Sequence, residues 1–597
     1  MRNQVSLCMI VKNEEEYLPR CLASIKEIVD EIIIVDTGST DRTVDIAKSF
    51  DAKVYLFKWN NNFSEARNES LKHASKDWIL IMDADEELYK EDQELLKILL
   101  SNKLDENAIY NFQGVSYCGN YIDENNKIIN LNPRLFKNKI GLHYEGAIHN
   151  QLAYGENNYH VICEDVKVHH YGYLNKRIVA TDKRNRNLTI LNDQLKKHPN
   201  DKFVLFNLGN EYAALGDLKK ALELYYRCYD NFNPDVGFGY ALIIRMVYVN
   251  FDIGEYDESL RLIDEGIKYY PECTDLYFLK SENYKVLAKP TLQIKALEKC
   301  IQLGEPPANL KFFDGTGGVK AFYELGNAYY GLRDFETAYN YYIEALKADT
   351  SFIDPIYNIM HILRLENKSI SEIKSVVEDF FTESSKDYVF IGDIFFKEGY
   401  YNTALEYLNR CNDSSLREEI NILKSRCLIR IGDFQGCVVL TEVDKKHQAY
   451  IEFFFSKFLS YILLKRYNDA NKLLEEIKKE ESINHRYKER ITVYEQLIKL
   501  FIKETTTILS KDVSERIYID IIIEICEIML INKRYDELSI AVNLGNLTNS
   551  RLMLLALGKL YYRNGYFELA KKEILRSIRE FEIYDSEALE MLKAVTP

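Results

Sequence analysis

Two aspartates stand two residues apart where an apolar run ends. Asp83 and Asp85 follow residues 78–82, a stretch typical of a buried strand. Side chains two apart at the end of a strand point the same way, so both carboxylates can face one cation or one nucleotide. Carboxylate oxygens are ligands that Mg²⁺ and Mn²⁺ prefer. The pair therefore predicts a divalent-cation site that neutralises phosphate charge, with an exposed acidic turn as the alternative.

Two further polar side chains suit a nucleotide. Asp36 follows a β-branched run, and its carboxylate can accept hydrogen bonds from a base such as uracil. The alternative for Asp36 is that it holds the bend at Gly38. Arg67 carries a planar guanidinium suited to phosphate or base recognition, and the alternative is an ion pair with the acidic cluster that contains Asp83.

The elements that must position these residues alternate between strand and helix. Short apolar runs typical of strands alternate with helical spacing in the order 5–11, 17–28, 32–35, 43–50, 54–57, 66–74 and 78–82. Thr40 or Asp41 is the expected N-cap of the second helix. This order predicts an α/β domain with a parallel sheet, in which ligands bind beyond the carboxyl ends of the strands. Residues 100–180 are less regular and contain no long helix.

Three segments carry a resemblance to a known family, namely 6–15, 34–43, and 64–68 with 81–86. Their order and spacing resemble those of the family 2 glycosyltransferases, which have a nucleotide-diphospho-sugar transferase (GT-A type) fold. The resemblance covers about residues 4–175. It implies an inverting enzyme with a UDP-sugar donor and Mn²⁺ or Mg²⁺, bound by Asp85, with Asp83 facing the ribose or the metal. The nucleotide-sugar contacts that it implies are Val11, Asn13, Glu14, Asp36, Arg67, Asp83 and Arg134. For Asn13 and Glu14, a surface loop without ligand contact is the alternative.

The acceptor side is assigned by the same resemblance. Residues 132–136 and 143–151 look like an element of glycosyltransferases that carry tetratricopeptide tails, although many relatives have Glu where this chain has Asn150. An inverting transfer needs a carboxylate to take the acceptor proton. Glu145 is the candidate, with a purely structural role as the alternative. His170 resembles a residue that completes the metal shell or contacts the diphosphate. Other carboxylates near the donor site, such as Glu86 or Glu87, are the fallback for the base.

After about residue 180 the sequence becomes helical and repetitive. The small and aromatic positions of segments 207–212, 324–329 and 556–561 match the tetratricopeptide pattern, which has two antiparallel helices in 34 residues. We therefore expect a catalytic domain over 1–180 and an all-α repeat superhelix over 181–597. A loop rich in Gly and Pro is inserted between Ala288 and Arg333. The turns within the helix pairs are expected at Gly216, Gly254, Ala288, Arg333, Glu366, Gly399, Gly432, Lys465, Lys533 and Gly565.

The composition of the chain restricts the classes of partner and the cellular location that we expect. The 597-residue chain has a net charge of −15, which disfavours nucleic acid as a partner. No run approaches the length of a membrane span and no apolar leader follows Met1, so we expect a cytoplasmic protein. Eleven cysteines without a Cys-x-x-Cys pair are typical of buried thiols in a reducing compartment.

The expected function is transfer of a hexose or N-acetylhexosamine to a polypeptide that the repeats bind. The enzymes that the chain resembles include bacterial ones that modify flagellin on Ser or Thr and others that modify bacteriocin peptides on Cys. Modification of Ser or Thr is the preferred prediction. A polysaccharide or cell-wall transferase is a second enzymatic alternative. A repeat scaffold with an inactive transferase domain is the alternative from another class. The sequence leaves the sugar, the acceptor and the oligomeric state open.

Overall fold

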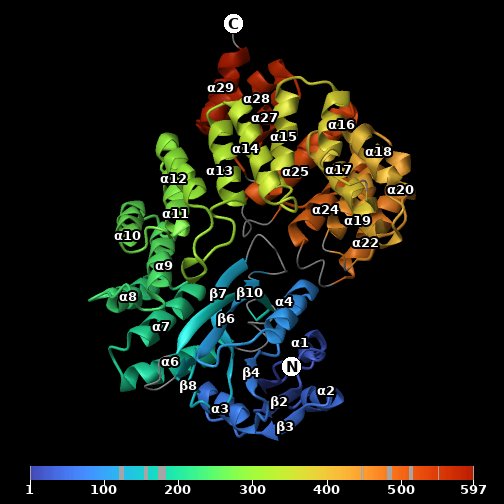
Figure 1. Ribbon diagram of the computed structural model, residues 1–597. Helices are drawn as coiled ribbons and strands as arrows, with labels where there is room; N and C mark the ends of the chain where they lie inside the picture. The colour runs from blue at the N-terminus through green and yellow to red at the C-terminus, as the bar shows by residue number, and fades with distance from the viewer. Residues whose placement is uncertain are drawn as a thin grey trace. The chain divides into compact units, whose positions relative to one another are not determined.

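The protein is described by a computed structural model that divides into two compact units, Met1–Pro355 and Ile356–Pro597 (Figure 1). The expected domain boundary near residue 180 lies outside the described residues. The structure describes residues 2–117, 119, 127–153, 159–172, 183–382, 384–445, 447, 449–480, 487–509, 515–548 and 550–595.

An eight-stranded sheet forms the first part of the chain, with the strand order β3-β2-β1-β4-β7-β6-β10-β5. Strands β3, β2, β1 and β4 are parallel, which confirms the α/β fold and the predicted order of elements. Their bounds are β1 Val5–Val11, β2 Glu31–Asp36, β3 Lys53–Leu56 and β4 Trp78–Ile81.

The other half of the sheet comes from the region that looked irregular in sequence. It is formed by β5 Glu86–Glu87, β6 Ala108–Tyr117, β7 Lys127–Lys137 and β10 His160–His170. Strand β7 runs antiparallel to both β4 and β6, so the sheet is mixed rather than wholly parallel. A separate two-stranded sheet pairs β8 His143–Glu145 with β9 Gln151–Ala153. Polar residues inside these strands, such as Asn111 and Gln113, hid their strand character.

Helices cover both faces of the parallel strands. They are α1 Leu18–Ile25, α2 Thr43–Ser49, α3 Phe63–His73 and α4 Lys90–Ser101. Leu7 and Met9 pack with residues of α1 and α4, whereas Cys8 between them packs on the other face. The N-cap expected at Thr40 or Asp41 was wrong: α2 begins after Arg42, although the Asp41 carboxylate accepts a hydrogen bond from the Thr43 amide at 3.0 Å.

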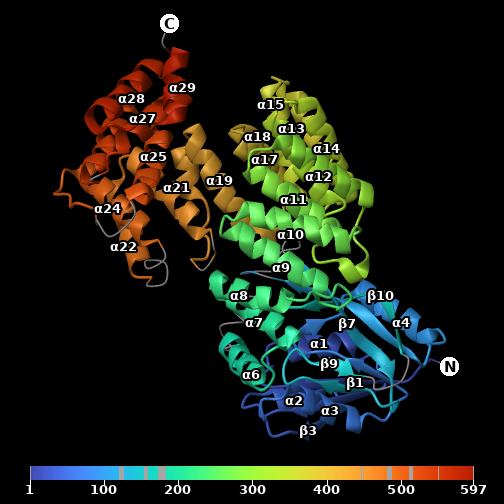
Figure 2. The same cartoon turned by 90° about the vertical axis from the view of Figure 1, so that its left-hand side faces the viewer.

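Helix pairs follow the sheet and stack in chain order up to α14 (Figure 2). In the first unit they are α6 Lys183–Lys197, α7 Lys202–Ala214, α8 Leu218–Tyr229, α9 Gly239–Asp252, α10 Tyr256–Tyr269, α11 Thr274–Val286, α12 Pro290–Leu303, α13 Val319–Gly331 and α14 Phe335–Ala348, with the short 3₁₀ helix η1 Ala308–Leu310. Gly209 and Gly326 each lie against a tyrosine ring, Tyr225 and Tyr342 respectively, where a Cβ would collide. The small and aromatic positions of the repeat pattern are therefore packing positions.

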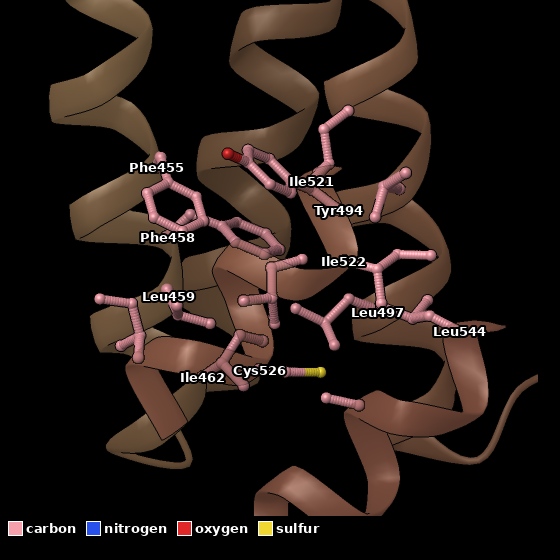
Figure 3. Close-up of a cluster of buried hydrophobic side chains, with 14 of the residues drawn as sticks. Phe455, Phe458, Leu459, Ile462, Tyr494, Leu497, Ile521, Ile522, Cys526 and Leu544 are labelled. Carbon is pink, nitrogen blue, oxygen red and sulfur yellow. The ribbon is translucent and has the colours of Figure 1, made fainter. Parts of the chain in front are cut away.

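The second unit continues the helical pattern. Its helices are α15 Asp354–Leu365, α16 Ile370–Glu378, α17 Ser385–Lys397, α18 Tyr401–Arg410, α19 Arg417–Ile431, α20 Phe434–Val439, α21 Tyr450–Leu463, α22 Tyr467–Lys478, α24 Lys488–Ile502, α25 Glu515–Ile531, α26 Tyr535–Ala541, α27 Met553–Arg563, α28 Phe567–Phe581 and α29 Ser586–Val595, with 3₁₀ helices η2 Ser414–Leu416 and η3 Val542–Leu547. Figure 3 shows its buried core, in which Phe455 and Phe458 of α21 lie beside Tyr494 of α24, and Cys526 of α25 belongs to the same cluster.

The predicted turns have a shared backbone conformation. Nine of the ten expected positions have a positive φ, including Gly216 at 81° and even Lys465 at 59°. The tenth is displaced by one residue, because Asn367 at 55° takes that conformation instead of Glu366. Within the part of the chain that the structure describes, none of the helices combines the length and apolar character needed to span a membrane.

Candidate functional site

The carboxyl ends of β1 and β2 lie side by side. Val11 pairs with Asp36 in the parallel register, and the Val11 carbonyl accepts hydrogen bonds from the Thr37 amide and hydroxyl, both at 3.0 Å. The buried Asp36 carboxylate accepts hydrogen bonds from the amides of Gly38 and Ser39 at 3.1 Å. Asp36 therefore does hold the bend, as its alternative reading expected, and its contact with a base stays a prediction.

Asn13 and Glu14 connect the loop after β1 to the loop after β2. Asn13 has a positive φ of 55°, its amide donates to the Ser39 hydroxyl at 2.9 Å, and its side-chain oxygen accepts from the Thr40 amide at 2.8 Å. The Glu14 amide donates to the Thr43 hydroxyl at 2.7 Å. The structure thus brings these residues to the edge of the sheet where Val11 and Asp36 end.

Arg67 and Asp83 form a close ion pair at the end of β4. A guanidinium nitrogen of Arg67 donates to a carboxylate oxygen of Asp83 at 2.6 Å, and the guanidinium lies 5.6 Å from the centre of the Tyr144 ring. Burial raises the pKa of Asp83, but attraction to Arg67, Arg134 and His170 outweighs it and holds that pKa below its ordinary value. Asp83 is therefore kept as a carboxylate, and Arg67 fixes its orientation.

Arg134, predicted as a nucleotide-sugar contact, is bound to groups of the protein itself, and its contact with a donor stays a prediction. It lies on β7, 8% exposed, and donates two hydrogen bonds to Glu86, at 2.8 and 2.5 Å, and one to the Ile81 carbonyl at 3.2 Å. Glu86 also accepts a hydrogen bond from the Asp83 amide at 2.8 Å. This buried pair braces the turn that carries both aspartates. Sequence analysis named Glu86 only as a fallback base and missed its structural role.

Loss of this brace should destabilise the first unit. Arg134→Met would leave Glu86, 4% exposed, as a buried carboxylate without its partner, and we expect a loss of about 3–5 kcal/mol in the free energy of unfolding. Trp78, buried on the neighbouring strand β4, provides a fluorescence signal for urea unfolding.

The double variant Glu86→Gln with Arg134→Met removes the stranded charge and should recover part of that stability. A cost below about 1 kcal/mol for Arg134→Met would contradict the bracing role.

Asp85 and His170 face each other because β5 pairs with β10. The register joins His170 to Glu86, and the His170 Nε2 atom lies 3.6 Å from an Asp85 carboxylate oxygen. The other ring nitrogen, Nδ1, lies 3.2 Å from the Ser116 hydroxyl, which orients the imidazole. A Cβ on Gly172 would lie 2.5 Å from that Nε2 and 2.6 Å from Asp85, so a residue larger than glycine would collide with both groups.

This pair fits the divalent cation that the sequence implied. A carboxylate and an imidazole are both ligands for Mn²⁺, and at 3.6 Å from each other the two groups are close enough to share one ion. Within the residues that the structure describes, no three His, Cys, Asp or Glu side chains are grouped as a metal site would need. The metal role of Asp85 and His170 therefore stays a prediction.

Glu145 lies apart from these groups. Its side chain is 68% exposed and accepts a hydrogen bond from His143 Nε2 at 3.1 Å. Alternation along β8 directs Glu145 away from the face on which buried Tyr144 meets Arg67. Of the fallback carboxylates, Glu86 is held by Arg134, and Glu87 accepts a hydrogen bond from the Tyr171 hydroxyl at 3.0 Å. Glu145 is the most exposed of the three, at 68% against 22% for Glu87 and 3% for Glu86.

Comparisons with known proteins agree with this fold. The family model of glycosyl transferase family 2 matches residues 6–152, and a tetratricopeptide repeat model matches 204–231 and 319–352. A TPR repeat-containing protein of Synechococcus elongatus is 33% identical over 265 residues, 43% of this chain and 64% of its own length. Glycosyltransferase SunS of Bacillus subtilis is 27% identical over 283 residues, 46% of this chain and 65% of its own. The chain thus covers slightly less than two thirds of these relatives.

Two solved structures are similar over shorter stretches. Glucosyl-3-phosphoglycerate synthase from Mycobacterium tuberculosis is 25% identical with a TM-score of 0.17, over 19% of this chain and 44% of that chain. MamA is 20% identical with a TM-score of 0.25, over 29% of this chain and 94% of that chain. The family models, rather than these overlaps, indicate the kinds of domain: residues 6–152 match the model of glycosyl transferase family 2, and residues 204–231 and 319–352 match the tetratricopeptide repeat model.

Proposed function

We propose that this protein is an inverting glycosyltransferase that moves a sugar from a UDP-sugar to a polypeptide. The observation that carries the proposal is the pairing of Asp85 with His170 beside Gly172, at the edge of the sheet where Asp83 is fixed by Arg67. In open α/β sheets, ligands bind beyond the carboxyl ends of the strands, and this cluster stands at such an edge. The family match over residues 6–152 supports a nucleotide-sugar donor.

In this proposal Asp85 and His170 hold Mn²⁺ or Mg²⁺. The cation, when bound, neutralises the diphosphate and its developing charge as a Lewis acid. Ser116 holds the His170 ring in one orientation, and Arg67 keeps the Asp83 carboxylate charged and directed toward the donor. The bend at Gly38, which Asp36 fixes, forms part of the surface against which the uracil ring of the donor would lie. Glu145 takes the acceptor proton, since its exposed carboxylate can be reached from solvent.

The repeats favour a polypeptide as the acceptor. Stacked helix pairs create extended surfaces that bind peptides and proteins, which a lipid or small-molecule acceptor would not need. Transfer to Ser or Thr of a protein such as flagellin is the first choice within the proposal. Transfer to a peptide Cys, or to a polysaccharide, would use the same donor site. An inactive scaffold is disfavoured because Asp83, Asp85 and Arg67 remain together in the site.

To test this proposal, the full-length protein is incubated with Mn²⁺ and, in turn, with UDP-glucose, UDP-galactose, UDP-N-acetylglucosamine and UDP-N-acetylgalactosamine. Flagellin and a Cys-containing bacteriocin peptide serve as acceptors, and intact-mass spectrometry reports addition of one hexose or N-acetylhexosamine. We expect addition to the hydroxyl acceptor with one class of donor. The enzymatic proposal would be contradicted if the protein bound no UDP and neither hydrolysed nor transferred the sugar of any of the four donors. The inactive scaffold would then be the remaining alternative.

A further inference from the structure

The loop inserted between α12 and α13, residues 304–318, is a built part of the repeats rather than a loose connection. Asp275, on α11 and fully buried, accepts hydrogen bonds from the amides of Phe312 at 2.7 Å and Phe313 at 3.1 Å. The Thr316 hydroxyl donates to the same carboxylate at 2.6 Å. One buried carboxylate thus fixes three groups of the loop, which extends between the two helices in Figure 1.

The two ends of the loop are also tied to each other. The Glu305 carboxylate accepts hydrogen bonds from the amides of Gly315 at 3.2 Å and Gly317 at 3.0 Å, and it pairs with Lys311 at 3.0 Å. Gly317 packs so closely on the backbone of Gly304 that a Cβ would overlap its carbonyl group. These contacts hold the loop in one conformation before any partner binds, which lowers the cost of binding.

The fixed loop closes a cavity of about 280 Å³ against the first helices of three successive repeats. Tyr248 comes from α9, Phe278 from α11 and Tyr323 from α13, while Phe313 comes from the loop. The ring centres of Tyr248 and Phe313 are 5.6 Å apart. Phe312 of the loop is buried in the core of the preceding repeats, whereas Phe313 beside it lines the cavity, so the loop adds the cavity to the repeat surface.

The size and charge of the cavity indicate which kind of ligand it can bind. Pockets for whole small-molecule ligands have about 300–1,000 Å³, so this one is suited to a single side chain rather than to a nucleotide sugar. Its charged lining residues, Lys320 and Glu324, are of opposite sign. Glu324 already accepts hydrogen bonds from Lys285 at 2.6 Å and Asn327 at 3.2 Å. The aromatic lining therefore carries no excess charge, which favours an apolar or aromatic side chain over an ion.

We propose that this loop-closed pocket, lined by Tyr248, Phe278, Phe313 and Tyr323, binds an aromatic side chain of the acceptor polypeptide and so anchors it on the repeats. The inference rests on the proposed function for the identity of the acceptor. The pocket itself is defined by contacts that involve no residue of the donor site. It would give the enzyme a preference for acceptors with an aromatic residue at a fixed distance from the glycosylated one.

Saturation-transfer NMR on the full-length protein, without nucleotide sugar, tests the pocket directly. The probes are N-acetyl-phenylalanine amide, N-acetyl-lysine amide and methyl N-acetylglucosaminide. We expect the phenylalanine probe to bind and the other two to bind at least about tenfold more weakly, since only the aromatic probe can stack in the pocket. Phe313→Ala should weaken binding of the phenylalanine probe by about tenfold.

A second variant, Tyr248→Ala on α9, should have the same effect although it replaces no residue of the loop. Tyr584→Ala, which removes a tyrosine that is 72% exposed elsewhere in the chain, is the matched control and should leave binding unchanged. Binding that survives both pocket variants, or preference for the lysine or sugar probe, would overturn the proposal. Because no donor is present, such a result would leave the transferase proposal standing.

Discussion

Replacing Asp85 with asparagine should reduce sugar transfer by about 10³-fold or more while the protein stays folded. The substitution keeps the shape of the side chain but removes the charge that would bind the cation opposite His170. A single preorganised group that stabilises transition-state charge is typically worth about 10²–10³-fold, and loss of the cation removes more than one such contact. Rates with excess Mn²⁺ and calorimetric binding of UDP are the two measurements.

The fold should tolerate this change because the backbone carbonyl of Asp85, which accepts a hydrogen bond from the Tyr171 amide at 3.1 Å, is retained. Asp51→Asn is a suitable control, since its carboxylate is 87% exposed and pairs only with Lys26 among the ion pairs described for it. The control should transfer sugar at the wild-type rate. Full activity of Asp85→Asn in excess chelator would refute the metal assignment. UDP affinity that depends on Mn²⁺ in the wild type but not in Asp85→Asn would support it.

The parts of the fold that the sequence predicted well are those with local signals. Strands β1 to β4 are short apolar runs with helical spacing between them, and each was placed to within about a residue of its observed bounds. The repeat turns were placed from the glycine and aromatic positions of the repeat pattern and from its period, so Lys465 and Lys533 were found although neither is the glycine that such a backbone favours. Periodicity carried this information even where the residue type did not.

Long-range pairing is what the sequence could not supply. Arg134 was assigned to the nucleotide sugar through the family resemblance, whereas its partner in the structure, Glu86, is 48 positions away in the chain. Only the antiparallel pairing of β7 with β4 places the two side chains together. The same holds for His170, which reaches Asp85 because β5 pairs with β10. An acid directly after Asp-Ala-Asp, with a lone Arg in a later strand, is the signal that could have suggested the brace.

Glu145→Gln should lower turnover with a hydroxyl acceptor by about 10²–10⁴-fold, the usual contribution of general-base catalysis. The change keeps the size of the side chain and its ability to accept a hydrogen bond from His143, but removes its basicity. UDP affinity should stay near the wild-type value, since Glu145 contacts none of the groups around Asp85 in the contacts described for it. Rates with saturating donor, measured for Ser and Cys peptides, are the readout.

Glu106→Gln is the matched control, because Glu106 is also 68% exposed and also pairs with one cation, Lys137. Its turnover should be unchanged. The nucleophile gives an internal check on Glu145: a hydroxyl needs its proton removed during attack, whereas a thiol is already partly ionised near neutral pH. A large loss with Ser and a small loss with Cys identifies a base. Equal losses with both would indicate that Glu145 positions β8 through His143, and wild-type turnover with Ser would exclude it from catalysis.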